Sequence, residues 1–176
     1  MTPTASQIAC RPVSLPPEVY VAAAKTAVWE NPANAPAVFA LTLLAAGEPD
    51  SAPDPSRLAL LTSKYWGAGG VDLGVTFLDT AEAELKSKIL YWMNRWGQFA
   101  NILFRESRRG EVRIARTEGE GYYSYLGTDI LHIRVGEPTM NLDSFTSGTP
   151  DSEYERVVVH EAGHTLGFVH EHLRSD

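Results

Sequence analysis

The chain has 176 residues and a formal net charge of −7, and 44% of its residues are hydrophobic and 21% charged. This composition is ordinary for a globular chain of one domain, or of one domain with an extension. An acidic chain lacks the basic surface that binds nucleic acid or an anionic membrane, so we expect neither as a partner. The single cysteine, Cys10, excludes an intrachain disulfide, and the longest apolar run, Ala37 to Ala46, is shorter than the roughly 20 residues that span a bilayer.

The N-terminal part, residues 1–56, is rich in proline and alanine, and we expect it to be an extension of the pro-segment type. It contains two predicted helices, Glu18–Trp29 and Pro36–Ala46. The segment Gly47–Ser56 follows, and its prolines are typical of a linker or an exposed loop. The first residues lack the charged and apolar stretches of a signal peptide. The sequence leaves the compartment and the oligomeric state open.

Residues 57–176 show the regular patterns of a folded domain. Apolar and polar residues alternate over Val71–Phe77, which predicts a half-buried strand. Apolar side chains then recur at helical spacing over Thr80–Trp96, and Asp79 and Glu82 fit a capping box at the start of this stretch. We therefore expect a long helix with one broad buried face.

Further strands are predicted after this helix, separated by turns that contain glycine. The candidates are Ala100–Phe104, Val112–Ile114, Ile130–Val135 and a short one within Thr139–Phe145. A last helix should run from about Ser152 to Leu166, because Ser152 and Glu155 fit a second capping box. The order strand, helix, several strands, helix indicates an α/β or α+β domain in which helices pack on one sheet.

The last helix carries the stretch HEAGHTLGFVH. His160 and His164 are four residues apart, so both imidazoles lie on one face of the helix and can reach the same metal ion. Gly167 can take the left-handed conformation that ends the helix, which lets His170 turn back as a third ligand. Three histidine nitrogens with one position open for water are typical of a catalytic zinc site. Glu161, beside the ion rather than on it, can then accept a proton from that water.

Each of these assignments has an alternative. The paired histidines can be core or surface residues without a metal, and Glu161 can be a solvated carboxylate. His172 is the rival of His170 as third ligand, but it lies off the spacing of the motif and is interpreted as a surface residue. Glu171 is interpreted as a structural partner in a hydrogen bond or salt bridge. His132 falls within a predicted strand and is interpreted as structural.

The pattern HExxHxxGxxH resembles the zinc signature of the metzincin metallopeptidases. Its continuation with phenylalanine, then His-Glu, and later Arg174 and Asp176 is similar to the astacin subgroup. Two upstream stretches also resemble that subgroup. KYWGAGGVDLGVTF (64–77) is similar to the opening strand of the astacin catalytic domain, and GYYSYLGTD (121–129) is similar to the segment that precedes its edge strand. The resemblance covers residues 58–176, and bacterial astacin-type peptidases fit best because animal astacins have disulfides.

The resemblance implies the N-terminal subdomain of a metzincin fold, with a twisted, mostly parallel sheet, an antiparallel edge strand, a long backing helix and the zinc helix. It implies a zinc-dependent endopeptidase that acts on peptide or protein substrates. In this reading Zn²⁺ is bound by His160, His164 and His170, and Glu161 is the general base and acid. The edge strand of such enzymes pairs antiparallel with an extended substrate, and we place it at Pro138–Leu142.

The chain departs from the family after the third histidine. The family carries there a second subdomain with a methionine turn beneath the zinc, whereas Met1, Met93 and Met140 all precede the motif. The alternative function is therefore a truncated, catalytically weak or silent module that binds zinc or peptide. A closed structural zinc site is a third interpretation, but it needs a fourth ligand that the motif does not supply.

Cys10 is a candidate metal ligand in the N-terminal extension. A thiolate from a pro-segment can occupy the zinc ion and keep such an enzyme latent. The local sequence CRP lacks the wider cysteine-switch motif of the matrixins. A free or buried cysteine without a switch function is therefore the alternative.

Overall fold

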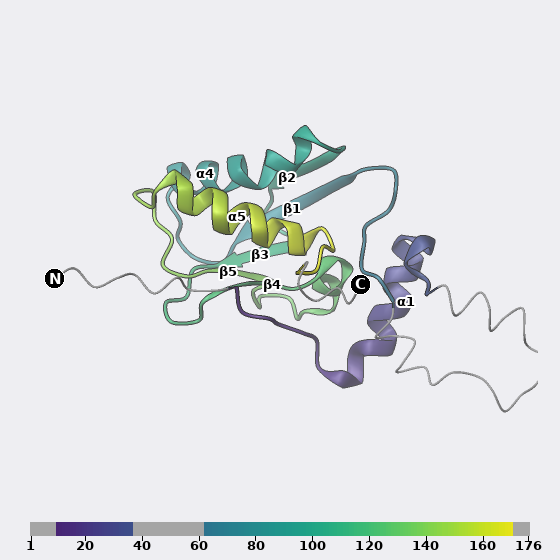
Figure 1. The fold of residues 1–176 in the computed structure, drawn as a ribbon. Coiled ribbons are helices and arrows are strands. Elements are labelled where there is room, and N and C mark those ends of the chain that lie inside the picture. The colour runs from purple at the N-terminus through teal and green to yellow at the C-terminus, as the bar shows by residue number, and fades with distance from the viewer. Residues whose placement is uncertain (1–9, 37–61, 171–176) are drawn as a thin grey trace, which may run out of the picture.

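The computed structural model describes residues 10–36 and 62–170 (Figure 1). Within these ranges the helices are α1 (Tyr20–Glu30), α4 (Ala83–Met93) and α5 (Asp151–Thr165), with short 3-10 helices η1 (Pro17–Val19), η2 (Pro32–Asn34), η4 (Asn94–Gln98) and η5 (Gly127–His132). The strands are β1 (Val71–Phe77), β2 (Ile102–Glu106), β3 (Val112–Ala115), β4 (Tyr122–Ser124) and β5 (Met140–Leu142). None of the described helices is both long and apolar enough to cross a membrane.

The described strands form one five-stranded sheet in the order β2-β1-β3-β5-β4. β1 pairs in parallel with β2 and with β3, and β3 pairs in parallel with β5. Only the pair β4 with β5, at one edge of this sheet, is antiparallel. Neighbouring parallel strands need a crossover, and α4 lies in the crossover from β1 to β2. The structure confirms the predicted α+β fold with its mostly parallel sheet and antiparallel edge strand.

The core of the molecule lies between the sheet and the two helices α4 and α5, which contact each other along the sheet (Figure 1). Ile89 and Met93 of α4, Val158 of α5, and Val75 and Ile114 of the sheet are all fully buried in one cluster. Each aliphatic side chain buried in this way contributes about 1.5–3 kcal/mol. This packing fixes the position of α5, the helix that carries the HExxH residues.

The starts of both long helices differ from the prediction. α4 has Glu82 as its N-cap residue and no side-chain cap. Asp79 lies three residues before this N-cap, and its carboxylate instead accepts a hydrogen bond from the Nε atom of Arg116 at 2.8 Å. α5 begins one residue before Ser152, directly after Pro150, and also has no side-chain cap. Both predicted capping boxes are therefore wrong, although both helices are present.

The predicted strand Ile130–Val135 is wrong, because the 3-10 helix η5 covers its first half and ends at His132. Gly127 begins this element with a backbone φ of 47°. Ile130 is buried in the core whereas Leu131 is 40% exposed. The alternation of apolar residues here therefore comes from the packing of a helical turn and not from a pleated strand.

The edge of the sheet is not at Pro138–Leu142, where the sequence placed it. β5 lies in this range, but it sits between β3 and β4 inside the sheet. The outer strand is β4, which runs antiparallel to β5. β4 has only three residues, all of them buried, and this is too short a stretch to show an alternating pattern.

The helix predicted over Glu18–Trp29 is present as η1 and α1. α1 packs against η5 (Figure 1). The Oγ1 atom of Thr26 lies 2.9 Å from the Nε2 atom of His132. The predicted helix Pro36–Ala46 and the predicted linker Gly47–Ser56 lie outside the described residues except for residue 36. The division into an extension of residues 1–56 and a domain of residues 57–176 therefore stays a prediction.

Candidate metal centre

The last two turns of α5 carry His160, Glu161 and His164. The four-residue spacing of the histidines places both rings on one face of the helix. Their Nε2 atoms are 3.1 Å apart. The helix alone therefore brings two imidazole nitrogens to one point.

A tight turn after α5 brings in the third histidine. Gly167 has a backbone φ of 104°, as its predicted place at the helix end requires. Its N–H donates to the carbonyl of His164 at 2.9 Å, and the N–H of Phe168 donates to the carbonyl of Gly163 at 3.0 Å. This pair of bonds is a Schellman motif. The turn leads the chain back to His170, whose Nε2 atom lies 3.1 Å from those of both helix histidines.

The three Nε2 atoms form an equilateral triangle with sides of 3.1 Å. An N–H···N hydrogen bond prefers a linear geometry. Three ring nitrogens at the corners of a triangle cannot form such a bond for every pair, so the three rings cannot all be hydrogen-bonded to one another. Four-coordinate zinc, with nitrogen ligands at about 2.0–2.1 Å, holds neighbouring nitrogens about 3.3 Å apart. The triangle therefore fits a shared metal ion better than a hydrogen-bonded cluster.

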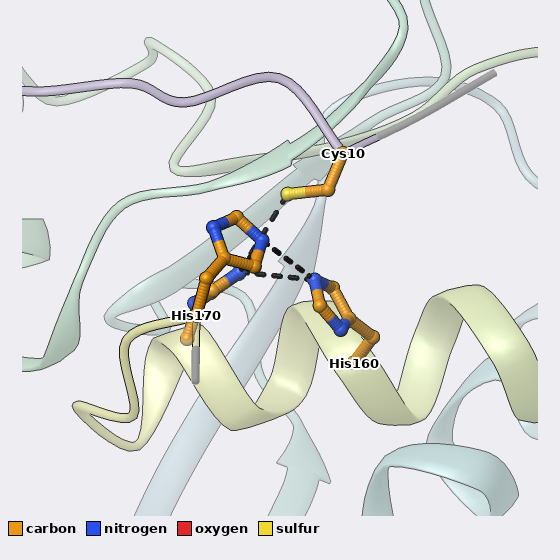
Figure 2. Close-up of side chains that lie close together, drawn as sticks. Cys10, His160 and His170 are labelled. Carbon is orange, nitrogen blue, oxygen red and sulfur yellow. Dashed lines mark hydrogen bonds between the residues drawn. The ribbon is translucent and has the colours of Figure 1, made fainter. Parts of the chain in front are cut away.

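Cys10 adds a fourth donor, and Figure 2 shows its side chain pointing at the histidines. Its Sγ atom is 3.6 Å from the Nε2 atom of His164. Tetrahedral zinc with a Zn–S distance of about 2.3 Å places sulfur and nitrogen about 3.6 Å apart. The donor atoms of Cys10 and the three histidines all lie within 4.8 Å of one another. These residues therefore fit a zinc ion held by three nitrogens and one sulfur.

Burial favours the neutral form of His160 and His164, which is the form that binds metal. Burial, together with His164, His170 and Arg156 nearby, lowers the pKa of His160 to about 4. Burial also lowers the pKa of His164. The Nδ1 atom of His164 donates to the carbonyl oxygen of Phe168 at 2.6 Å, which leaves the lone pair of Nε2 free for a metal ion.

Glu161 is almost fully buried beside this cluster, with 1% of its surface exposed. Burial raises its pKa to about 7, although a hydrogen bond from Cys10 and the charge of Arg156 act in the opposite direction. That hydrogen bond runs from the Cys10 thiol to the Oε2 atom over 3.6 Å. Burial and the Glu161 carboxylate raise the pKa of the thiol to about 12. A bound metal ion reverses this preference, because it deprotonates a coordinating thiol outright.

The residues around Cys10 form one side of a cavity of about 390 Å³ next to the centre. Cys10 pairs with Tyr122 of β4 in a parallel bridge, and the N–H of Arg11 donates to the carbonyl of Tyr122 at 2.7 Å. Arg11 also forms an ion pair with Glu120 at 3.3 Å. The N-terminal segment therefore lies along the outer strand of the sheet, in the same direction as β4.

The structure brings together all of the predicted ligands and the predicted base. His132 lies elsewhere, next to Thr26, at the end of η5 rather than in the predicted strand. Glu171 and His172 lie outside the described residues.

Three residues at or near the centre carried little or no signal in the sequence. The interpretation of Cys10 was open, because 151 positions separate it from Glu161 and only its chemistry pointed to a metal. The contacts of Trp66 and Trp96 with α5 were not predicted. Each donates from its indole nitrogen to a carbonyl of α5, at 2.8 and 2.9 Å respectively.

Comparison with known proteins identifies relatives of this chain. The family model described as Astacin, a family of peptidases, matches residues 62–176. Among curated proteins, Zinc metalloproteinase nas-27 of Caenorhabditis elegans is 30% identical over 91 residues, which are 52% of this chain and 19% of that protein.

Two solved structures of myroilysin resemble the fold. One has a TM-score of 0.57 and 39% identity, over 62% of this chain and 48% of its own. The other has a TM-score of 0.56 and 33% identity, over 68% of this chain and 50% of its own. The chain therefore corresponds to about half of these solved chains and to a smaller part of the curated relative.

Proposed function

Because the chain belongs to the astacin family of peptidases, which includes zinc metalloproteinases, we propose that it is a zinc-dependent endopeptidase whose described state is held inactive by its own N-terminal segment. The proposed zinc ligands are His160, His164 and His170. The proposed general base and acid is Glu161. The proposed substrates are peptide or protein chains.

The observation that carries this proposal is the arrangement of four donor atoms around one point, with a buried carboxylate beside it. A zinc ion held there would polarise the scissile carbonyl and make its bound water more acidic. Glu161 takes a proton from the attacking water as the new C–O bond forms. It gives that proton to the leaving amine as the C–N bond breaks. A pKa of about 7 suits a group that first accepts and then donates a proton near neutral pH.

The position of Cys10 supports latency. Its sulfur lies 3.6 Å from both His164 Nε2 and Glu161 Oε2, which is the place that a water shared by the metal and the base would occupy. The direction of the segment supports latency as well. An extended substrate of this fold pairs antiparallel with the outer strand, whereas the N-terminal segment runs parallel to β4. Its peptide bonds therefore run in the opposite direction to those of a substrate bound at the proposed catalytic groups.

Metal content and cobalt substitution test the ligand set. We expect the full chain to bind one zinc or cobalt ion, with a thiolate-to-cobalt charge-transfer band in the cobalt form. Cys10→Ala should remove this band and keep the metal, because three histidines remain. His160→Ala should weaken metal binding itself. A wild-type chain without stoichiometric metal would contradict the proposed function.

Cleavage of an unfolded protein tests activity and latency. We expect Cys10→Ala to cleave faster than the wild-type chain. Ser14→Ala is the matched control, because Ser14 is exposed in the same segment and should leave the rate unchanged. Adding Glu161→Ala to Cys10→Ala should lower the rate by about 10²–10⁴-fold while metal binding is kept. A double variant that retains the rate would show that Glu161 is not the base.

The same experiments separate the second candidate function. A catalytically silent zinc-binding or peptide-binding module is the alternative, because four protein donors around one point leave no position open for water. Stoichiometric zinc without cleavage, in both the wild-type chain and Cys10→Ala, would favour that module over the peptidase.

A further inference from the structure

Trp96 lies in η4, directly after the backing helix α4, and its side chain lies against the end of α5. It does not reach the metal centre itself. It contacts three residues, each of which lies within two positions of a proposed zinc ligand. The apolar periodicity of residues 80–96 gave no indication of these contacts.

The first two contacts are with α5. The indole Nε1 of Trp96 donates to the carbonyl of Val159 at 2.9 Å, and Val159 directly precedes His160. The indole ring also lies against Gly163, which precedes His164. A Cβ atom at Gly163 would come within 3.1 Å of the Cζ2 atom of Trp96, so the absence of a side chain at this position lets the ring approach the helix.

The third contact is with the turn that follows α5. The rings of Trp96 and Phe168 are stacked, with their centroids 5.2 Å apart and an interplanar angle of 11°. The carbonyl of Phe168 accepts the hydrogen bond from Nδ1 of His164, and Phe168 lies two residues before His170. A shift of Phe168 would therefore rotate one ligand and move another.

We propose that Trp96 is a positioning residue that holds the last turn of α5 and the following turn in the arrangement that binds zinc. The inference rests on the proposed metal site. Partners of this kind, which orient ligands without touching the metal, commonly change metal affinity by about 10–100-fold when they are removed. The indole is suited to this role because it combines a stacking face with a single N–H donor.

The test is zinc affinity, measured by competition with a chelator on the full chain. We expect Trp96→Ala to weaken zinc binding by about 10–100-fold, because it loses both the stack and the hydrogen bond. Trp96→Phe keeps a stacking ring and loses only the N–H, so its loss should be smaller. Trp92→Phe is the matched control, since Trp92 lies in α4, packs against the core and has its ring against Tyr91. Its zinc affinity should equal that of the wild-type chain.

Gly163→Ala separates positioning from stability. Alanine favours a helix more than glycine does, which offsets the cost of the closer contact with the ring, so the metal-free protein should keep a similar free energy of unfolding in urea. The new methyl group nevertheless pushes against the indole ring, so zinc affinity should fall. A variant that is stable without metal and yet binds zinc weakly cannot be explained by loss of folding alone.

The outcomes distinguish this inference from the proposed function. If the wild-type chain binds no zinc, the proposed metal site itself is wrong. If the wild-type chain binds zinc, and Trp96→Ala and Gly163→Ala are folded and bind it equally well, the site stands and the role of Trp96 is overturned. Weaker binding by both variants, with Trp92→Phe unchanged, supports the inference.

Discussion

His164 ties the metal centre to the fold through both of its ring nitrogens. Nε2 faces the other two histidines, and Nδ1 donates to the carbonyl of Phe168 in the turn after the helix. The residue is 8% exposed, so its ring has little freedom to rotate. Because a backbone carbonyl fixes both the tautomer and the ring plane, the ligand is oriented before a metal ion arrives.

Gly167 should be intolerant of a side chain. Its φ of 104° disfavours other residues, and a Cβ atom would lie 2.9 Å from the Cδ1 atom of Tyr65. We expect Gly167→Ala to lower the free energy of unfolding by about 2–4 kcal/mol. Zinc affinity should also fall, because this turn places His170. Urea unfolding in the presence of chelator, followed by zinc titration, measures both effects.

Gly119 provides the control for this substitution. Its φ is 81°, but nothing lies within 4 Å of a Cβ atom at this position. Gly119→Ala should therefore cost only about 1 kcal/mol, from backbone strain, and should leave zinc affinity unchanged. Equal losses of stability and of zinc affinity in the two variants would contradict a specific role for the turn at Gly167.

The helix α1 is connected through Asn34 and Tyr65 to the turn that follows α5. The Nδ2 atom of Asn34 donates to the carbonyls of Ala27 and Tyr65 at 2.8 and 2.7 Å, and its Oδ1 atom accepts from the N–H of Tyr65 at 3.0 Å. The ring of Tyr65 packs edge-to-face on Phe168, with centroids 5.8 Å apart. The N-terminal part is therefore anchored at two places, by Asn34 near the end of the zinc helix and by Cys10 at the centre.

Asn34→Ala should destabilise the protein strongly. Asn34 is 1% exposed, and its loss leaves two carbonyls and one N–H without their partner. We expect the free energy of unfolding to fall by about 2–4 kcal/mol. Asn101→Ala is the control, because Asn101 is exposed and makes one long bond of 3.4 Å to Gly69. It should change stability by less than about 0.5 kcal/mol. Similar losses for both variants in urea unfolding would contradict the anchoring role.

The proposed zinc site joins parts of the chain that are far apart in sequence, since Cys10 and His170 lie near the two ends of the described residues. A ligand that binds only the folded state stabilises it by mass action, by about 4 kcal/mol when free zinc is a thousand times its dissociation constant. For a chain of this length such a gain corresponds to a rise in Tm of roughly 8–16 °C.

Chelation should therefore lower the Tm of the wild-type chain by an amount in this range, measured by thermal unfolding with and without zinc. The variant that carries both His160→Ala and His164→Ala should unfold at the same temperature under both conditions. A zinc-dependent shift that persists in this double variant would place the ion elsewhere in the molecule.

The local features of this protein could be predicted because each depends on residues close together in the chain. The spacing of His160 and His164 on a helix, and the need for a glycine at position 167, follow from backbone geometry alone. The strand Val71–Phe77 and both long helices follow from apolar periodicity. The fold class followed from the order of these elements and from the resemblance of the motif to a family.

The features that could not be predicted depend on contacts between distant residues. The stretch Ile130–Val135 alternates like a strand, yet its packing makes its first half a 3-10 helix. β5 and β4 are both short strands, and only the order of strands in the sheet decides that β4 is the edge. Trp96 carries an ordinary apolar signal until its position against Val159 is known.

By itself, the sequence predicted the three histidines and the carboxylate of the proposed site, because their chemistry and spacing are fixed within one helix and the turn that ends it. The tertiary structure decided that the Cys10 sulfur reaches the same point, at 3.6 Å from His164, across a separation of 154 residues. No local pattern encodes such a contact, because it depends on the docking of an N-terminal segment along a strand that is itself placed by the whole sheet.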